Sequence, residues 1–392
     1  MKLKSLLLGS AAVLALSTGA QAADPIPATF VSLGVCDAYG ISGLTIESDD
    51  TCLSISGEVS YEWAVEDLSL TTGFGYTSDV DWELAFEATT QTDSGAAVAF
   101  ISFVDDDTTG VDVDPVIDQA YVQFGDTTVL SAGLKDSAFD TEILDRTYGG
   151  GDEYGVFDWD YDENDLTAGS IVAQGGHVIT IESLVADGFT VIAGFEDLEN
   201  NGTALLGVQY DGGMFSGEAA VLVGDLYNNL ATDPVNFYAA VTAEFDSFEA
   251  RAGVLFDDTG YYIASLGASA TLDMFTLDVD AFFEDSGEWG VAGEGSFDAT
   301  DTVAVYLGAG YEEDTGTDSW TVYGGVDVDV TEVIVANAEL GYVERTGAIV
   351  TDYIYGAAGV TYAPGGGFET GLTVYANTLD DYKLTFEASK EF

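Results

Sequence analysis

Apolar and polar side chains alternate at the C-terminus, in Tyr382-Lys383-Leu384-Thr385-Phe386-Glu387-Ala388-Ser389-Lys390-Glu391-Phe392. One side of this stretch carries Tyr382, Leu384, Phe386, Ala388 and Phe392, interrupted only by Lys390, and the other carries Lys383, Thr385, Glu387, Ser389 and Glu391. A period of two places successive side chains on opposite faces of a β-strand. The stretch is also about as long as a tilted strand that crosses a bilayer. It predicts either a membrane-spanning strand or an amphipathic strand of a soluble β-sandwich.

The composition of the whole chain helps to separate these two alternatives. The 392 residues include 70 Asp and Glu against 8 Lys and Arg, a formal net charge of -62, yet 47% of the residues are hydrophobic. A disordered acidic chain would be poor in aromatic residues, whereas this one contains 22 Phe, 21 Tyr and 5 Trp. The 47 Gly and 5 Pro suit many strands joined by tight turns. We therefore expect charged and apolar side chains to lie on opposite faces of the strands.

The N-terminus has the features of an export signal. Lys2 and Lys4 precede an apolar run over residues 6–16, which is followed by the small-x-small sequence Ala20-Gln21-Ala22. A membrane anchor is the competing interpretation, but the run is too short to span a bilayer and no stop-transfer segment follows it. We expect cleavage near Ala22, which removes residues 1–22 and both lysines and takes the net charge from -62 to -64. No later stretch has about 18 uninterrupted apolar residues, so a membrane-integral form must be a closed barrel.

The two cysteines, Cys36 and Cys52, flank a turn region of Gly, Ser and Asp. In an exported chain this pattern predicts one local disulfide. A metal pair fits less well, because the one histidine is His177 and the spacing matches no zinc motif.

The sequence around these cysteines resembles a known family. Val-Cys-Asp-Ala-Tyr-Gly at residues 35–40, then Thr-Cys-Leu at residues 51–53 and a long alternating strand, is similar to the mature N-terminus of alphaproteobacterial outer-membrane porins. The terminal Phe392 resembles the aromatic residue that the barrel-assembly machinery reads in such proteins. An Arg commonly follows the Cys-Leu pair in that family, but Ser54 occupies this position here. This difference matters because inward arginines help to set the channel charge in that family.

Alternating runs recur along the rest of the chain, from Leu53 to the C-terminus. We count about twenty of them at a spacing of roughly 17 residues, whereas porins of the family have sixteen strands. The prediction is an all-β, up-and-down antiparallel transmembrane barrel over residues 53–392, after a periplasmic disulfide segment at residues 23–52. Its strand number should be even, 16 by resemblance and up to about 20 by the count of runs. Aromatic residues expected at strand ends, where membrane-interface girdles lie, are Tyr61, Trp63, Tyr210, Phe245, Tyr311, Tyr342, Tyr362 and Phe392.

The longest irregular segment, at about residues 135–176, follows the fifth predicted strand. From Asp136 to Asp165 it holds eleven acidic residues against one basic residue, Arg146. Its position resembles that of the loop that folds inward and narrows the barrel of trimeric porins, although a Pro-Glu-Phe type motif is absent; a solvated surface loop is the alternative. The resemblance places at the constriction Asp136, Asp140, Glu142, Asp145, Arg146, Asp152, Glu153, Asp158, Asp160 and Asp162.

Strand alternation also predicts which charged side chains line the lumen. They are Glu58, Glu62, Asp81, Glu83, Glu87, Glu244, Glu249, Arg251, Asp278, Asp280 and Lys383. A field of one sign inside a low-dielectric wall concentrates counter-ions, and rings of carboxylates select cations. The sequence therefore predicts a passive, cation-selective channel for small hydrophilic solutes in the outer membrane, a homotrimer by resemblance.

Other functions find less support in the sequence. One histidine, with no Gly-x-Ser-x-Gly motif and no metal-ligand cluster, leaves no nucleophile and base for an enzyme. Residues 158–163 open like a calcium loop but carry Glu163 where Gly is needed, so we expect no cofactor beyond loosely bound Ca²⁺ or Mg²⁺. The lack of basic patches argues against nucleic acid. The remaining alternatives are a substrate-selective uptake channel of the same fold and a secreted, acidic, calcium-binding β-protein.

Overall fold

The computed structural model describes residues 36, 41, 43–48, 50–68, 73–105, 115–139, 175–227, 234–314, 316–347 and 351–392. The elements described over their full length are all strands. They are β1 (Leu44–Glu47), β2 (Thr51–Leu68), β3 (Gly73–Thr92), β4 (Gly95–Asp105), β5 (Pro115–Gly125), β6 (Thr128–Lys135), β7 (Gly176–Ala186), β8 (Phe189–Glu196), β9 (Thr203–Asp211), β10 (Phe215–Val223), β11 (Val235–Phe245), β12 (Phe248–Asp257), β13 (Tyr262–Leu272), β14 (Phe275–Glu284), β15 (Trp289–Thr300), β16 (Val303–Asp314), β17 (Thr317–Thr331), β18 (Ile334–Gly347), β19 (Thr351–Gly365), β20 (Phe368–Asn377) and β21 (Tyr382–Glu391).

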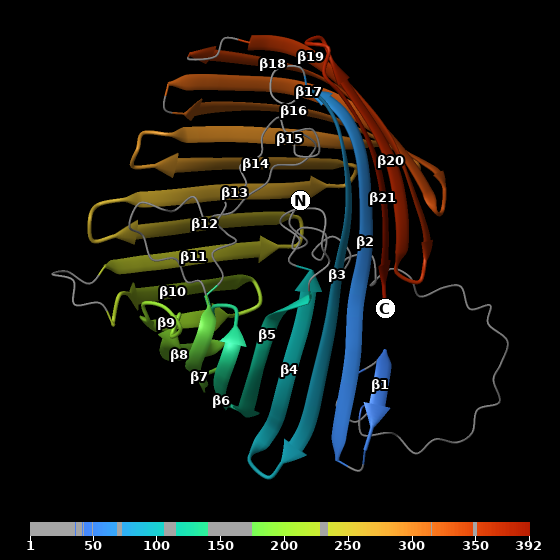
Figure 1. Ribbon diagram of the computed structural model, residues 1–392. Coiled ribbons are helices and arrows are strands. Elements are labelled where there is room, and N and C mark those ends of the chain that lie inside the picture. The colour runs from blue at the N-terminus through green and yellow to red at the C-terminus, as the bar shows by residue number, and fades with distance from the viewer. Residues whose placement is uncertain are drawn as a thin grey trace, which may run out of the picture.

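The strands β2 to β21 form a closed antiparallel barrel (Figure 1). Each strand pairs with its neighbours in the chain, and β21 pairs with β2 from Glu58↔Glu391 to Asp67↔Tyr382, which closes the ring. Closure satisfies the backbone hydrogen-bonding groups of the terminal strands, as a bilayer requires. The barrel therefore has 20 strands, since β1 is the one strand of the 21 described that stands outside the ring. The run count was right, and the sixteen strands implied by the family resemblance were wrong for this chain.

The two ends of the barrel differ in the length of their connections. At one end the strands are joined by short turns, at residues 93–94, 126–127, 187–188, 212–214, 246–247, 273–274, 301–302, 332–333 and 366–367. At the other end the longer connections include residues 106–114, 136–175 and 224–234. The strands β2 and β21 begin and end the barrel at the short-turn end. Bacterial outer-membrane barrels have this same asymmetry, with their short turns in the periplasm.

Apolar side chains cover the outer face of the barrel. On β12, Phe248 and Phe256 point outward near the two strand ends, with the small residues Ala250 and Ala252 between them. Eight residues, at about 3.4 Å per residue and a tilt of about 40°, separate these rings by roughly 20 Å along the membrane normal. Aromatic rings contact one another at both levels. The pairs are Phe237–Phe256, Trp289–Tyr311 and Trp320–Tyr342 on one level and Phe189–Tyr210, Phe215–Phe245 and Phe275–Phe297 on the other. An apolar band between two aromatic girdles is the surface expected of a membrane barrel.

Two of the aromatic residues expected at strand ends lie elsewhere. Tyr61 and Trp63 are inside β2 rather than at its end, because that strand continues to Leu68. The strand predicted from the sequence ended at Glu66, two residues before the end of β2.

The short strand β1 lies at the seam of the barrel, where the last strand, β21, meets the first, β2. β2 extends past the end of β21, and β1 pairs with this overhang from Leu44↔Ile55 to Glu47↔Cys52. Between the two partners, Gly57 and Phe392 exchange backbone hydrogen bonds of 3.1 and 3.0 Å. β1 thus continues the line of β21 along the edge of β2, as Figure 1 shows just beyond the C-terminus. The Cys36–Cys52 disulfide forms as predicted, with an S–S distance of 2.02 Å.

Candidate channel lumen

Carboxylates face one another on the inner wall at the seam. Glu58 on β2 lies directly opposite Glu83 on β3 and Glu391 on β21. Four residues further along β2, Glu62 has Asp79 and Glu387 as its cross-strand partners. Like charges placed directly opposite one another repel. Cations that reach these carboxylates would therefore reduce the repulsion between them.

The lumen-wall residues predicted from the sequence all occupy strand positions on the same inner face as Glu58. On β2 and β3 they are Glu58, Glu62, Asp81, Glu83 and Glu87; on β11 to β14 they are Glu244, Glu249, Arg251, Asp278 and Asp280; on β21 it is Lys383. The outward positions between them carry apolar side chains such as Val59 and Val279. The structure gathers these residues into two acidic strips, one over β21, β2 and β3 and the other over β11 to β14.

An ion pair crosses the second strip. The Arg251 guanidinium on β12 lies 3.1 Å from the buried Asp280 carboxylate on β14 and 3.7 Å from Glu249. The intervening strand β13 has Gly267 at this level, and a Cβ there would lie 2.0 Å from Asp280 Oδ1. Glycine is therefore required for the two side chains to meet. The pair neutralises part of the local negative charge.

Several inward charged residues were missed in the sequence. Lys135, the last residue of β6, lies 3.8 Å from Glu182 and 5.4 Å from the centre of the Tyr121 ring. Arg345 occupies an inward position on β18, opposite Thr351 and Ser319. The alternation of inward and outward side chains along each strand would have predicted that both residues face inward. The additional inward carboxylates on β15 to β18 include Glu294, Glu312, Asp327 and Glu339.

Tyrosine side chains form a wall on the inner face of β16 to β20. Tyr306 and Tyr355 donate hydrogen bonds of 3.0 and 2.7 Å to opposite oxygens of Glu339. Tyr323 donates one of 2.9 Å to Glu294, and Tyr355 stacks on Tyr375 with ring centres 5.8 Å apart. Each of these rings belongs to one apolar cluster with Phe282 and Val343. The hydroxyl–carboxylate bonds hold the wall rigid while leaving it acidic.

A second apolar cluster lines β8 to β13 at the end of the barrel with the longer connections. Phe139, four residues beyond β6, is 1% exposed and belongs to this cluster with Ile192, Leu205, Ala220, Leu222, Tyr238, Leu255 and Ile263. The connection that follows β6 therefore begins inside the barrel. A signal for this cluster existed in the sequence, because runs such as Val254-Leu255-Phe256 lose their alternation and indicate a strand covered on both faces.

The residues expected at a constriction are only partly described. Asp136 is exposed and accepts a 2.8 Å hydrogen bond from Gln119 Nε2 on β5. The remaining members of the set lie outside the described residues: Asp140, Glu142, Asp145, Arg146, Asp152, Glu153, Asp158, Asp160 and Asp162. Their place in the barrel stays a prediction.

In the described ranges, no group of three or more His, Cys, Asp or Glu side chains is placed to hold a metal ion. No helix in that part of the chain is long and apolar enough to cross a bilayer.

A closed barrel with an apolar belt, aromatic girdles and a charged interior defines a transmembrane β-barrel of the porin class. A family model described as the Porin subfamily matches residues 20–391, and the chain belongs to this family. Members of this class are channels rather than enzymes.

Curated relatives agree with the family match over shorter stretches. The chain is 34% identical to Porin Omp2b of Brucella suis over 157 residues, which is 36% of this chain and 41% of the relative. It is 52% identical to Porin Omp2a of Brucella ovis over 66 residues, 16% of this chain and 19% of that porin. A putative outer membrane protein of Sinorhizobium fredii, y4fJ, is 32% identical over 140 residues, 32% of this chain and 41% of the relative. The chain thus spans at most about two fifths of the length of these relatives.

Matches to solved structures have lower sequence identity. An engineered variant of the Rh. blastica porin is 16% identical, with 87% of this chain and all (100%) of that chain covered and a TM-score of 0.47. Outer-membrane expressed OmpT of Vibrio cholerae is 17% identical, with 89% of this chain and 100% of that chain covered and a TM-score of 0.43.

Proposed function

We propose that this protein is an outer-membrane porin that forms a water-filled, cation-selective channel for passive diffusion of small hydrophilic solutes. The width of the barrel supports an open path. With strands about 4.8 Å apart and tilted by about 40°, a ring of 20 strands is roughly 40 Å across between opposite backbones. Side chains alone do not fill a barrel of that size, and porins with about 16 to 18 strands already hold water.

The proposed preference for cations rests on one observation, the carboxylates that face one another at the seam. Glu58, Glu83 and Glu391 are adjacent across three strands, and Glu62 repeats the arrangement with its own acidic neighbours. Such a wall attracts cations and repels anions, and divalent cations would collect there without a fixed coordination site. The Debye length is about 8 Å at physiological ionic strength, so the preference should weaken in concentrated salt.

Reconstitution of detergent-purified protein in planar bilayers tests the channel itself. We expect stepwise increases of conductance and swelling of liposomes in small neutral sugars. Absence of both in folded, heat-modifiable protein would contradict the proposal.

A substrate-selective channel of the same fold is a second candidate, and the tyrosine wall favours it. Rings fixed by Glu294 and Glu339 present a rigid surface with both aromatic and acidic groups. A solute that binds there would block the conductance of KCl in a saturable manner, whereas a general diffusion channel would show no such block.

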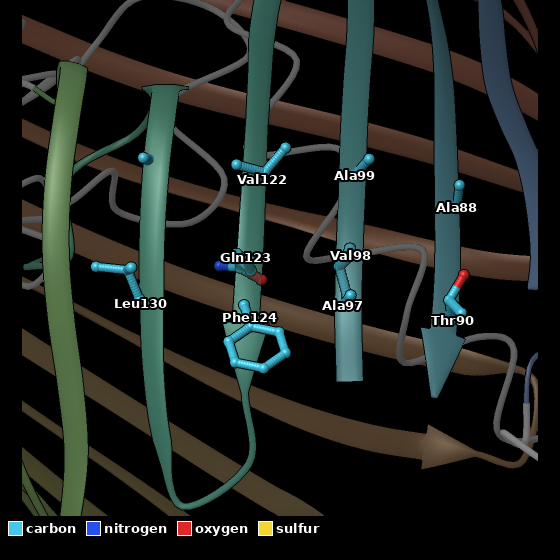
Figure 2. A pocket seen from close by; sticks show the side chains of 10 residues that line it. Ala88, Thr90, Ala97, Val98, Ala99, Val122, Gln123, Phe124 and Leu130 are labelled. Atoms are coloured by element: carbon cyan, nitrogen blue, oxygen red, sulfur yellow. The ribbon is translucent and has the colours of Figure 1, made fainter. Parts of the chain in front are cut away.

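We further infer that the chain is exported by its N-terminal signal, is inserted by the barrel-assembly machinery through the strand ending in Phe392, and forms trimers in lipid. What supports the trimer, besides family resemblance, is a groove of about 420 Å³ on the outer face of β3 to β6 (Figure 2). Small residues floor this groove, among them Ala88, Ala97 and Ala99, and Val122, Phe124 and Leu130 line it. Small residues let two membrane proteins approach closely. We also infer that the 136–175 connection narrows the channel.

A further inference from the structure

Four aromatic rings form a continuous patch on the outer face of β15 to β18. Trp289 contacts Tyr311 with ring centres 5.0 Å apart, and Trp320 contacts Tyr342 with ring centres 5.2 Å apart. Tyr311 and Trp320 are direct cross-strand partners, so the two ring pairs adjoin. Trp320 is 39% exposed, and the patch therefore offers ring surface to the membrane.

Carboxylates border this aromatic patch on the outer face of the same strands and of β19. Glu313 on β16 lies directly opposite Asp318 on β17. Glu344 on β18 lies directly opposite Asp352 on β19, and its other cross-strand partner is Trp320. Like charges placed opposite one another repel. A positive charge beside each pair would reduce that repulsion.

Hydrogen bonds join these carboxylates to the rings. Trp289 Nε1 donates a 2.9 Å hydrogen bond to Glu313 Oε2, and the Tyr342 hydroxyl donates one of 3.3 Å to Glu344 Oε2. Each acidic pair is therefore held beside a ring pair. An aromatic face attracts a cation, Trp most strongly, and aromatic surfaces are the usual binding sites for quaternary ammonium groups. A cation at this edge would contact both rings and carboxylates.

The carboxylates lie at the level of lipid headgroups. Glu313 is two positions beyond Tyr311 on β16, toward the end of the barrel with the longer connections. Glu344 has the same relation to Tyr342 on β18. At about 3.4 Å per residue and a tilt of about 40°, each carboxylate is roughly 5 Å further along the membrane normal than the ring. The headgroup layer adds about 5–8 Å on each side of the hydrocarbon core.

We propose that the aromatic patch and its four carboxylates bind the quaternary ammonium group of a phosphocholine-type lipid headgroup. This inference depends on the place of the barrel in a membrane and not on the proposed channel function. Rings and carboxylates both attract the ammonium group, whereas a purely anionic headgroup would be repelled by the same carboxylates. The acyl chains of that lipid would lie along the outward apolar side chains below the patch, such as Val291 and Val322.

Native mass spectrometry in a maltoside detergent tests this preference directly. The protein is mixed with equal amounts of phosphatidylcholine and phosphatidylglycerol that carry identical acyl chains, and the lipids that stay bound are counted. We expect the parent to retain several-fold more phosphatidylcholine than phosphatidylglycerol. The double variant Glu313→Gln, Glu344→Gln should lose most of this preference, because it removes one charge from each acidic pair.

A matched control separates the patch from the overall negative charge of the chain, which also disfavours phosphatidylglycerol. Glu312→Gln with Asp327→Asn removes two charges from the inner face of β16 and β17 and should keep the preference of the parent. Trp320→Leu should reduce the retention of phosphatidylcholine several-fold, whereas Phe297→Leu, in the girdle at the other end of the barrel, should not.

Folding of each variant is checked by its heat-modifiable mobility on gels, and the charge variants still test the proposal if Trp320→Leu does not fold. Equal retention of the two lipids by the parent, or equal preferences in the outer-face and inner-face charge variants, would overturn it. A preference for phosphatidylglycerol that requires Mg²⁺ and is lost on chelation would also overturn it. That result would mean that divalent cations hold anionic headgroups at these carboxylates.

Discussion

Arg251 on β12 and Asp280 on β14 form an ion pair across the strand between them, with 3.1 Å from Nη2 to Oδ2. The glycine beneath them makes this contact sterically accessible, because an added Cβ at Gly267 would lie 2.0 Å from Asp280 Oδ1 and 2.4 Å from Arg251 Nε. Arg251 is the sole arginine of the described β11 to β15 wall, and it neutralises the Asp280 carboxylate, which is 3% exposed.

Separation of this ion pair should destabilise the barrel. We expect Gly267→Ala to reduce the free energy of unfolding by about 1–3 kcal/mol, because a buried carboxylate loses its charged partner. Urea unfolding in detergent micelles, followed by tryptophan fluorescence, measures this change. Gly295→Ala on β15 is the matched control, since its added Cβ has no neighbour closer than 4.0 Å and should cost little.

Neutralisation of the seam carboxylates should reduce the preference for cations. Glu58→Gln together with Glu83→Gln removes two charges that face each other on β2 and β3. The ratio of cation to anion permeability should fall, and acidification through about pH 4, where carboxyl side chains ordinarily take up protons, should lower it further in the parent. Asp187→Asn, in a short turn between β7 and β8, is the control that should leave the ratio unchanged. An unaltered ratio in the double variant would show that the seam does not set selectivity.

Loss of a hydroxyl from the tyrosine wall should weaken β18 and β19. Tyr355→Phe removes the 2.7 Å hydrogen bond to Glu339, a carboxylate that is 6% exposed. The expected cost is about 1–3 kcal/mol, since a buried acceptor loses a partner. Thermal unfolding, followed by the heat-modifiable mobility on gels, checks it. Tyr362→Phe, which changes an exposed tyrosine on the outer face of the same strand, should have a much smaller effect.

Removal of the disulfide should loosen the seam without changing the channel. Cys36 and Cys52 are 16 residues apart, and a disulfide closing a loop of that length contributes about 3 kcal/mol in the chain-entropy account. A Cys36→Ser, Cys52→Ser variant should release β1 from the edge of β2, and hydrogen exchange of residues 51–55 should then accelerate. Ion selectivity should stay as in the parent, because β1 stands outside the ring of strands. Protection of residues 51–55 that does not change would mean that strand pairing alone holds β1.

A bulky residue in the outer groove should disrupt a trimer. Ala99→Trp fills the floor of the groove on β4, whereas Ala268→Trp places the same ring on the outer face of β13. Native mass spectrometry in detergent should detect trimers in the parent and in Ala268→Trp, and mainly monomers in Ala99→Trp. Equal distributions for the two tryptophan variants would place the contact between subunits on another face.

Local alternation predicted the strands, and composition together with the family resemblance favoured a membrane barrel over a soluble sandwich. Alternation could do this because each strand pairs with its neighbour in the chain and the position of a residue along its strand determines which face its side chain occupies. The same alternation placed Glu58, Glu249 and Asp280 on the inner wall, and the spacing of Cys36 and Cys52 predicted the disulfide. The strand number was harder, because resemblance favoured sixteen and only the run count favoured twenty. The contacts of Phe139 and Glu196 could not be predicted from the sequence. They join residues about 60 to 120 positions apart through the interior of the barrel, where the pairing of neighbouring strands gives no information.

The reversal potential across a KCl gradient in a planar bilayer tests the cation-selective lumen most directly. If the inward carboxylates govern permeation, K⁺ crosses faster than Cl⁻ and the dilute side becomes positive, by an amount that shrinks as both salt concentrations are raised. A dilute side that becomes negative, or a potential of zero at low salt, would contradict the account.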